Sequence, residues 1–326
     1  MPGSVTTGST RFSPLAEGHL DGAAVLLAAR HAAGRRAEPA LDARFEDPAA
    51  SRDEIAALLA RDGASGVAAL RDGEVVGYLL GVPLDESWGP NVWVEPAGHA
   101  VAEPELVRDL YGVAAARWVE EGRTWHYAIV PATDPELVDA WFRLGFGHQH
   151  VHAIREPLGV EPVAPEGILL RRPRRGDVDV LARVDRSLAE HQLLSPVFSR
   201  VTLPTLEETR AEWDEDFDDP TYTTFVAERD GEILGAAIGC AIEVSSAHRS
   251  LTLPRGAGFL GFAAVLPEHR GLGAGRLLGE AVLAWAGDAG YPAVVTDWRM
   301  TNLLSSRTWP RLGFRPTFYR LHRAIA

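Results

Sequence analysis

The chain has 326 residues, more than one typical domain holds, and its 46% of apolar and 24% of charged residues are ordinary for a soluble globular protein. The formal net charge of −13 argues against nucleic acid and anionic membranes as partners and favours a cationic or amine-bearing one. The sequence has no apolar run long enough to span a bilayer and no signal-peptide pattern, and its single cysteine, Cys240, cannot form an internal disulfide. A cytoplasmic protein is therefore expected.

The first half of the chain alternates helical and strand patterns after residues 1–10, which predict a disordered tail. Helical periodicity runs from Leu20, and a second helix is expected over residues 53–61. Two strands at 66–70 and 75–82 flank Asp72-Gly73, a strong hairpin signal. The remaining expected elements are a strand at 91–95, a long helix after Pro104, a strand at 125–130, a helix at 135–143 and a strand at 149–155.

Residues 157–167 contain three prolines and predict a linker, after which the pattern returns. Helices are expected at 177–190 and 206–217, followed by strands at 223–228 and 232–244 around a second Asp-Gly turn. Short segments also repeat, since Trp141-Phe-Arg-Leu-Gly-Phe146 matches Trp309-Pro-Arg-Leu-Gly-Phe314. This self-similarity predicts two copies of one domain, at residues 11–156 and 168–326.

Residues 265–278 predict a strand end, a glycine-rich loop and the start of a helix. Gly271, Gly273 and Gly275 allow the backbone to turn sharply and to lie against a ligand. The helix that follows points its unpaired N–H groups into the loop, an arrangement suited to a phosphate or diphosphate. A dinucleotide fingerprint is excluded because Arg276 or Leu278 stands where its last glycine belongs, and a Walker loop because the chain has no lysine.

The loop follows Pro-Glu-His and spells Arg-x-x-Gly-x-Gly, with Arg270, Gly273 and Gly275 at its fixed positions. It resembles the acyl-CoA diphosphate loop of the GNAT superfamily of N-acetyltransferases, and Asn302, Trp309 and the Leu-Gly-Phe turn at 312–314 resemble the superfamily's closing motif. The resemblance implies a mixed α/β (α+β) protein with two GNAT folds in tandem, each a central, mostly antiparallel sheet with splayed strands flanked by helices. The architecture is similar to that of mycothiol synthase, but Trp309 and the residues at Ser305-Ser306 differ from what is expected of that enzyme, so its substrate is not assigned.

The resemblance implies acetyl-CoA as donor, CoA as product and no metal. Backbone N–H groups of Ala264 and Val265, at a break in the strand ending at Leu266, would polarise the thioester carbonyl. Asn302 would contact the cofactor arm or cap the next helix. The pantetheine and diphosphate would lie against Leu266, Arg270, Gly271, Leu272, Gly273, Ala274, Gly275 and Arg276.

The first copy departs from the pattern at this loop. An offset of 168 aligns residues 271–275 with 103–107, which contain no glycine and add Glu103 and Glu105. These carboxylates would repel a diphosphate. The first copy is therefore expected to lack the donor site and to serve as a scaffold that closes the acceptor cleft of the second.

Three residues are candidates for the general base: Asp297 at a strand end, Glu243 at the end of the long hairpin strand, and His191 after the first helix of the second copy. Each could instead be a solvated strand end or a cap, and a water relay could replace a dedicated base. Trp309 stands where many superfamily members carry a tyrosine acid, and an indole is not a practical proton donor. Protonation of the thiolate would then come from water or from another residue such as Tyr319, or would not be assisted by the enzyme.

Two further patterns are interpreted more simply. His148, His150 and His152 share one face of a strand, with no second cluster to complete a metal site. The acidic run 214–219 predicts a solvated helix end, or an acceptor entrance that attracts a cation.

The sequence thus predicts an N-acetyltransferase that moves an acetyl group from acetyl-CoA to an amine of a small molecule. The alternatives are a protein or peptide acetyltransferase, a bulkier acyl donor, and a CoA-binding protein without catalysis. A monomer or a homodimer is expected, without nucleic acid or membrane as partner.

Overall fold

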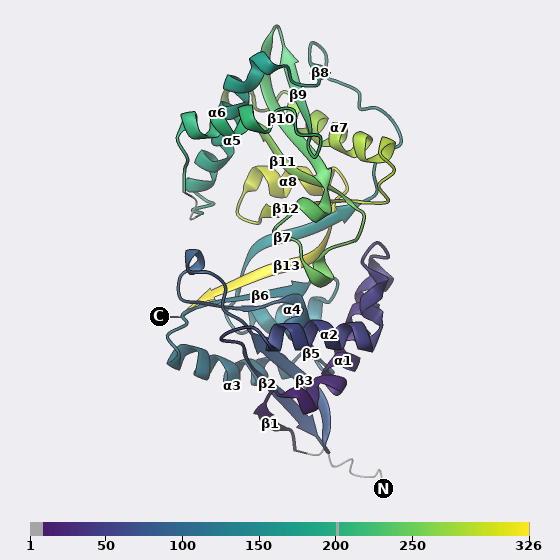
Figure 1. Ribbon diagram of the computed structural model, residues 1–326, viewed down its shortest axis with the longest axis vertical. Coiled ribbons are helices and arrows are strands. Elements are labelled where there is room, and N and C mark those ends of the chain that lie inside the picture. The colour runs from purple at the N-terminus through teal and green to yellow at the C-terminus, as the bar shows by residue number, and fades with distance from the viewer. Residues whose placement is uncertain (1–8, 200–201, 326) are drawn as a thin grey trace. The chain divides into compact units, whose positions relative to one another are not determined.

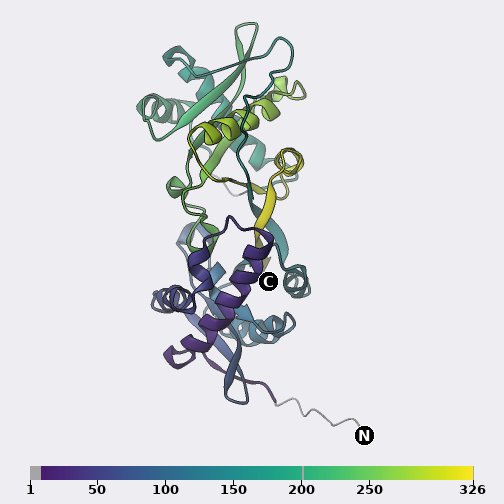
Figure 2. The same ribbon diagram turned by 90° about the vertical axis from the view of Figure 1, so that its right-hand side faces the viewer.

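The computed structural model describes residues 9–199 and 202–325, which form two compact units (Figures 1 and 2). Unit 1 contains the chain up to residue 150 together with residues 249–253 and those from 317 onward; unit 2 contains residues 151–248 and 254–316. Most of the expected tail, residues 1–8, lies outside the described residues. The expected second domain, 168–326, differs from unit 2 because its last strand pairs with a strand of unit 1.

In unit 1, helices α1 and α2 pack against each other, and α3 packs on β2 and β3. The strands form a four-stranded sheet, β1-β2-β3-β5, and the run β4-β6-β13. The elements are β1 (Arg11–Pro14), α1 (Leu20–Ala37), α2 (Pro48–Leu59), β2 (Ser65–Arg71), β3 (Glu74–Gly81), β4 (Asn91–Val94), β5 (His99–Val101), α3 (Leu106–Glu120), β6 (Trp125–Pro131), α4 (Pro135–Phe142) and β7 (Gly147–Arg155), which leads into unit 2.

Unit 2 repeats this order of elements around the strands β7-β12-β11-β10-β9-β8, with α5 and α6 on one face and α7 on the other (Figure 1). Its elements are β8 (Leu169–Arg171), α5 (Val178–Leu193), α6 (Leu206–Glu215), β9 (Thr223–Arg229), β10 (Glu232–Ala241), β11 (Gly258–Val265), α7 (Ala274–Asp288), β12 (Val294–Arg299) and α8 (Leu303–Arg311), followed by β13 (Arg315–Ala324), which returns to unit 1.

The repeat extends to core packing. Gly81 of β3 and Gly239 of β10 occupy equivalent positions, and each lies against the indole of a tryptophan, Trp118 or Trp285. A Cβ on Gly239 would lie 2.6 Å from the Trp285 ring, and one on Gly81 would overlap Trp118 as well. Each copy therefore uses a glycine in its long hairpin strand to let the central helix approach the sheet.

Several expected boundaries shift for local reasons. Helix α2 begins at Pro48, five residues earlier than expected, because the Asp47 side chain caps it and proline suits the first helical position. Strand β10 ends at Ala241 rather than at residue 244, so Glu243 lies in a following 3₁₀ turn. The short strands β1, β5 and β8 were not expected from the pattern, since each has only three or four residues.

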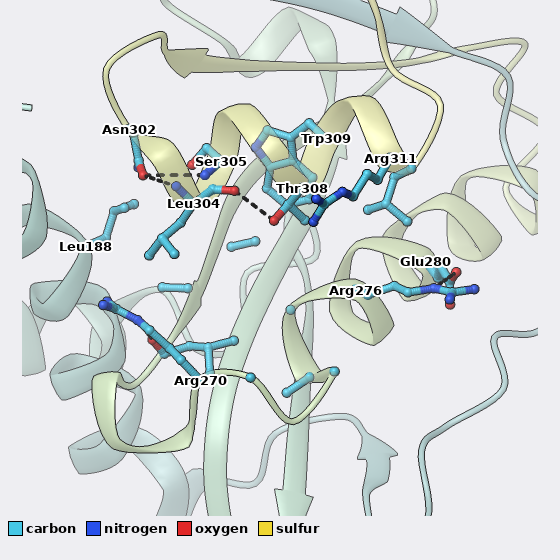
Figure 3. A pocket seen from close by; sticks show the side chains of 18 of the residues that line it. Leu188, Arg270, Arg276, Glu280, Asn302, Leu304, Ser305, Thr308, Trp309 and Arg311 are labelled. Atoms are coloured by element: carbon cyan, nitrogen blue, oxygen red, sulfur yellow. Dashed lines mark hydrogen bonds and ion pairs between the residues drawn. The ribbon is translucent and has the colours of Figure 1, made fainter.

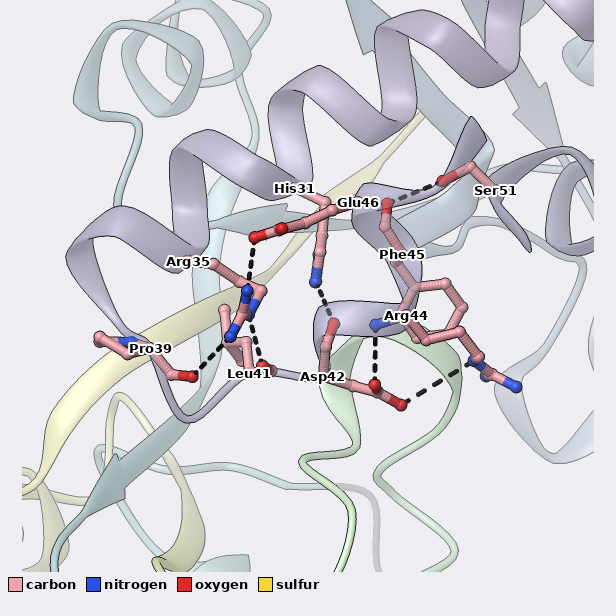
Figure 4. Close-up of polar contacts among 9 residues, drawn as sticks. All are labelled: His31, Arg35, Pro39, Leu41, Asp42, Arg44, Phe45, Glu46 and Ser51. Carbon is pink, nitrogen blue, oxygen red and sulfur yellow. Dashed lines mark hydrogen bonds and ion pairs between the residues drawn. The ribbon is translucent and has the colours of Figure 1, made fainter. Parts of the chain in front are cut away.

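The connection between α1 and α2 contains a short 3₁₀ helix, Ala43–Glu46, and is held by polar contacts (Figure 4). The buried His31 ring bonds the Asp42 carbonyl at 2.8 Å, and the Ser51 hydroxyl donates to the Phe45 carbonyl at 2.9 Å. Arg35 donates to the Leu41 carbonyl at 2.7 Å. Burial lowers the pKa of His31, which favours the neutral ring in this segment.

Other expectations concern single groups. Cys240 is buried, and burial raises the pKa of its thiol to about 11, as expected for an inert core residue. On β7, His152 is buried and His148 is half-buried, and burial lowers the pKa of His148 to about 4. Across residues 9–199 and 202–325, no helix is long and apolar enough to cross a membrane.

Candidate active site

Unit 2 contains a cavity of about 700 Å³ at the end of β11, where the glycine-rich loop meets α7 (Figure 3). Its walls come from four parts of the unit: the last turns of α5, the end of β11 with its loop, the first turns of α7, and α8. Of the expected donor-site residues, it is lined by Ala264, Val265, Arg270, Gly271, Gly273, Ala274, Gly275, Arg276 and Asn302. Leu266 is buried and Leu272 is exposed, and neither lines the cavity.

The loop has the backbone conformation that its glycines predict. Gly271 and Gly273 have φ of 85° and 88°, in the left-handed region that other residues seldom adopt. Gly273 is the N-cap of α7, and the first helical bond runs from the Leu277 N–H to its carbonyl at 3.1 Å. The N–H groups of the preceding first-turn residues therefore lack intrahelical acceptors and lie at the cavity wall, where the helix dipole favours an anion.

The charge of the cavity is opposite to that of the whole protein. Four arginines line it, namely Arg155, Arg270, Arg276 and Arg311, against one carboxylate, Glu280, which pairs with Arg276 at 2.7 Å. Among the described contacts, the Arg270 guanidinium makes one long bond, to the Val265 carbonyl at 3.4 Å. A cationic concavity in a chain of net charge −13 is a specific feature that fits a polyanionic ligand.

Strand β11 provides an open backbone edge. It is parallel to β12 only over residues 258–260, and a register shift against β10 leaves Gly261 as a bulge. The bond from the Leu266 N–H to the Leu234 carbonyl sets the ladder, so the N–H of Ala264 points towards β10, whereas those of Ala263 and Val265 point away from it. Of the two N–H groups expected to face a thioester, the structure presents that of Val265, together with that of Ala263.

His191 and Asn302 meet at this cavity, 3.2 Å apart between Nε2 and Oδ1. The Asn302 oxygen also accepts from the N–H groups of Leu304 and Ser305 and so caps α8. Because this oxygen is an acceptor in all three bonds, His191 Nε2 is the donor. In the neutral ring the proton is then on Nε2, and Nδ1 carries the free lone pair.

The other two candidate bases do not line the cavity. Asp297 lies within β12, which continues to Arg299 instead of ending at Asp297 as expected; it is half-buried, with one oxygen 3.9 Å from Nδ1 of the buried His248. The exposed Glu243 accepts from the Gly256 N–H at 3.0 Å and so holds the loop before β11.

The two candidate acids differ in position. Trp309 lines the cavity but is 7% exposed and packs against Gly279 of α7. Tyr319 belongs to unit 1, where its ring lies 4.1 Å from that of His148 and burial raises the pKa of its hydroxyl.

Several lining residues were not anticipated from the sequence. Ser187 and Leu188 come from α5, and Ser305, Thr308 and Arg311 come from α8. Arg155 and Leu158 come from β7 and the expected linker, whose Leu158 N–H donates to the Leu283 carbonyl at 3.0 Å. Farther along the linker, Pro165 lies 3.0 Å from the position of a Cβ on Gly273, so this segment packs on α7 and its loop instead of spanning solvent.

In the first copy, the equivalent place is filled. Arg30 corresponds to Leu188 by the offset of 158 between α1 and α5, and it donates to the carbonyls of Pro96 and His99, where β4 gives way to β5. The buried His99 ring reaches the Ile129 carbonyl of β6 at 3.0 Å. Burial lowers the pKa of His99 to about 3 and that of Arg30 to about 10. These side chains close the gap between the diverging strands.

The expected charge difference is also present in unit 1. The start of α3 lies beside a shallow pocket lined by four carboxylates and one arginine, Glu103, Glu105, Glu136, Asp139 and Arg143. This is the reverse of the charge around the α7 loop.

Comparison with known proteins agrees with this geometry. Residues 189–314, which include the glycine loop and α8, match the acetyltransferase (GNAT) family. The chain carries a GNAT acetyltransferase domain. A mycothiol acetyltransferase from Thermomonospora curvata is 28% identical over 277 residues, which cover 82% of this chain and 85% of that protein.

Solved structures show the fold of the whole chain. A GCN5-related N-acetyltransferase from Sphaerobacter thermophilus superposes with a TM-score of 0.56 at 16% identity, covering 97% of this chain and 95% of that one. A fungal multi-domain β-N-acetylglucosaminidase with a GCN5-related glucosamine N-acetyltransferase region gives a TM-score of 0.52 at 16% identity, covering 98% of this chain and 38% of that one. The two-copy GNAT fold expected from the sequence is confirmed.

The family and the relative identify the enzyme class expected from the sequence, an N-acetyltransferase that uses acetyl-CoA. In the part of the chain that the structure describes, no group of three or more His, Cys, Asp or Glu side chains could hold a metal ion.

Proposed function

We propose that the cavity of unit 2 binds acetyl-CoA and that the enzyme transfers its acetyl group to the amine of a small molecule. One observation carries the donor assignment: a left-handed glycine loop, a helix N-terminus, four arginines and an open strand edge converge on one cavity. The small-molecule acceptor is supported by the mycothiol acetyltransferase relative, which aligns over most of both chains.

The residues present fit the chemical parts of acetyl-CoA. The N–H groups at the start of α7 and the Arg270 guanidinium would hold the diphosphate. Arg155 and Arg311 lie elsewhere on the cavity wall, where they would attract a further phosphate group; Arg155 also donates to the carbonyls of Glu156 and Leu312. The N–H of Val265 would donate to the thioester carbonyl. Bound acetyl-CoA supplies the activated acetyl group; the protein's part is to position it and to handle protons.

We assign the role of general base to His191. It is the one residue of the three candidates that lines the cavity, and its bond to Asn302 fixes the tautomer that leaves Nδ1 free to accept a proton from an amine. Asp297, beside His248, is the second candidate. Glu243 already accepts a hydrogen bond from the Gly256 N–H. The thiolate is protonated by water in this scheme, because Trp309 packs against α7 and has no transferable proton of suitable acidity.

The first copy has no donor role in this proposal. Its glycine loop is replaced by the acidic segment before α3, and its strand gap is filled by Arg30 and His99. One molecule of acetyl-CoA per chain is therefore expected.

The test is calorimetric titration with acetyl-CoA, using variants matched for backbone strain. Gly271 and Gly231 both have φ of 85°, and a Cβ on either would have no neighbour within 4 Å, but only Gly271 lines the cavity. Gly271→Asp should weaken binding at least about tenfold, since the carboxylate would face the diphosphate, whereas Gly231→Asp should not. Equal losses in both variants, or two equivalents bound to the native chain, would contradict the donor assignment.

The acceptor is tested by turnover. With acetyl-CoA bound, small primary amines should release CoA, and His191→Gln should lower the rate by about 10²–10⁴ while leaving the affinity for acetyl-CoA unchanged. Release of CoA only with peptides or proteins would replace the small-molecule assignment.

A further inference from the structure

Unit 2 has a second, smaller cavity of about 160 Å³, between α5, α6 and the hairpin of β9 and β10. Its wall includes three carboxylates, from Asp185, Glu212 and Asp216, and three aromatic rings, from Trp213, Phe217 and Tyr222. No arginine or histidine is part of that wall. The cavity therefore combines uncompensated negative charge with aromatic faces.

The carboxylates differ from their neighbours in having no cationic partner. Arg175 pairs with Asp214 and Asp218 on the same segment, and Arg210 pairs with Asp179 of α5. Among the ion pairs of the described residues, Glu212 and Asp216 have none. Glu212 and Asp216 thus face the cavity without an ion-pair partner, whereas the neighbouring carboxylates are paired with arginines.

Asp185 is held in place for this cavity. The Trp213 indole donates to its Oδ2 at 3.0 Å, while burial, together with the nearby Glu212, raises the pKa of the Asp185 carboxyl. A bound cation would favour the ionised form of this carboxyl and relieve the repulsion from Glu212.

The aromatic rings have the chemistry of a cation site. The Arg175 guanidinium lies 4.6 Å from the centre of the Phe217 ring, so this ring already contacts a cation of the protein. Trp213 and Tyr222 present the two ring types that bind ammonium groups best.

Thr224 provides an independent observation. It lies on β9, is 8% exposed and lines the cavity, and its side chain makes no hydrogen bond with any residue that the structure describes. Its hydroxyl can therefore accept a polar hydrogen of a ligand.

We propose that this cavity binds a compact organic ammonium group. The volume equals roughly five water molecules, which is too little for a nucleotide and suits a small amine head. A metal ion does not fit, since no three or more His, Cys, Asp or Glu side chains among the described residues are arranged so that they could hold one. An ammonium group matches the set of partners, because its N–H groups can meet carboxylates and a hydroxyl while its alkyl part meets the rings.

The position of the cavity connects it with the donor site. Asp185 and Leu188 lie one turn apart on α5, and Leu188 lines the donor cavity. Ile238 of β10 lines the small cavity and pairs with Phe262, the neighbour of Ala263 at the open edge of β11. We assign the ammonium group to the acceptor, as a cationic group other than the reacting amine; this assignment rests on the proposed function.

The binding test compares propylammonium chloride with its uncharged analogue 1-propanol. Binding of each compound to the full chain is measured by ligand-observed NMR in the absence of acetyl-CoA. Propylammonium should bind and propanol should not. Glu212→Gln and Asp216→Asn should each weaken binding at least about threefold. Glu215→Gln, on the same helix but outside the cavity wall, removes the same charge and should have no effect.

The outcomes separate the two proposals. Equal binding of propanol, or equal losses in all three variants, would overturn the ammonium site. Binding of acetyl-CoA without binding of propylammonium would overturn this inference alone, whereas the reverse would overturn the donor site and leave the ammonium cavity. The link between them holds if trimethylammonium, which has no primary amine to acetylate, inhibits acetyl transfer competitively against a diamine acceptor, and it fails if inhibition is absent.

Discussion

The bond between His191 and Asn302 allows a direct test of the base assignment through Asn302→Asp. Asp and Asn are equally good N-caps, and a carboxylate at the start of α8 also suits the helix dipole. The substitution therefore keeps the fold of the site. It converts a neutral hydrogen bond into an ion pair with His191 whenever the imidazole is protonated.

The magnitude follows from the geometry. The two atoms are 3.2 Å apart, and Asn302 is 3% exposed, so the new carboxylate would be poorly screened by water. An opposite charge at such a distance favours the protonated imidazole over the neutral one. A base must be neutral to act, so the acidic limb of the pH–rate profile should move upward by at least about one unit, with little change at its plateau.

The assay is the pH dependence of kcat/KM for acetyl transfer to a primary amine, followed by release of the CoA thiol. Asn302→Ala serves as the comparison: it removes the cap, should cost about 1 kcal/mol of stability, and should not move the limb upward. An Asn302→Asp profile that is scaled but not shifted would refute the role of His191. Asp297→Asn would then be the next variant, because Asp297 is the remaining candidate.

Three further predictions concern stability and the first copy. Gly81→Ala and Gly239→Ala should each lower the free energy of unfolding by about 1–3 kcal/mol in denaturant titrations, because the new methyl group meets a tryptophan ring. His99 stays neutral when folded, with a pKa of about 3, so its stability contribution is complete above its unfolded pKa near 6.5 and is lost as the pH falls; at pH 5 the loss is about 2 kcal/mol, and a flat stability profile from pH 7 to 5 would contradict this. Arg30→Leu, which copies the second domain, should destabilise unit 1 by about 1–3 kcal/mol without adding a second equivalent of acetyl-CoA in calorimetry.

Local sequence signals predicted most of the fold, because the hairpins and helices are encoded by neighbouring residues. Asp72 and Asp230 adopt the positive φ that their Asp-Gly turns require, and the long helix expected after Pro104 begins at Leu106. The pairing of the last strand, β13, within unit 1 instead of unit 2 could not be predicted. Strand β13 has the same pattern whichever unit it joins, and its pairing with β6 is a non-local contact.

The donor loop was predictable for the same reason, since its glycines and arginine are contiguous. The residues that come from elsewhere were not: Arg155 and Leu158 reach the cavity because the linker packs on α7, which the prolines of the linker alone did not indicate. The candidate bases also required the structure, because the direction of a side chain at a strand end depends on tertiary packing. Asp297 and Glu243 were reasonable by position, and only the contacts separate them from His191.

The comparison of the two copies explains how one fold can be open in one unit and closed in the other. Both copies diverge at the same pair of strands, so both expose backbone groups that need partners. In the first copy the buried Arg30 and His99 supply those partners from within the chain. In the second, Leu188 stands where Arg30 would be and offers no hydrogen bond, so the edge at Val265 stays open beside the donor cavity. A single position on the first helix of each copy thus correlates with whether the strand gap is filled by protein or left for a ligand.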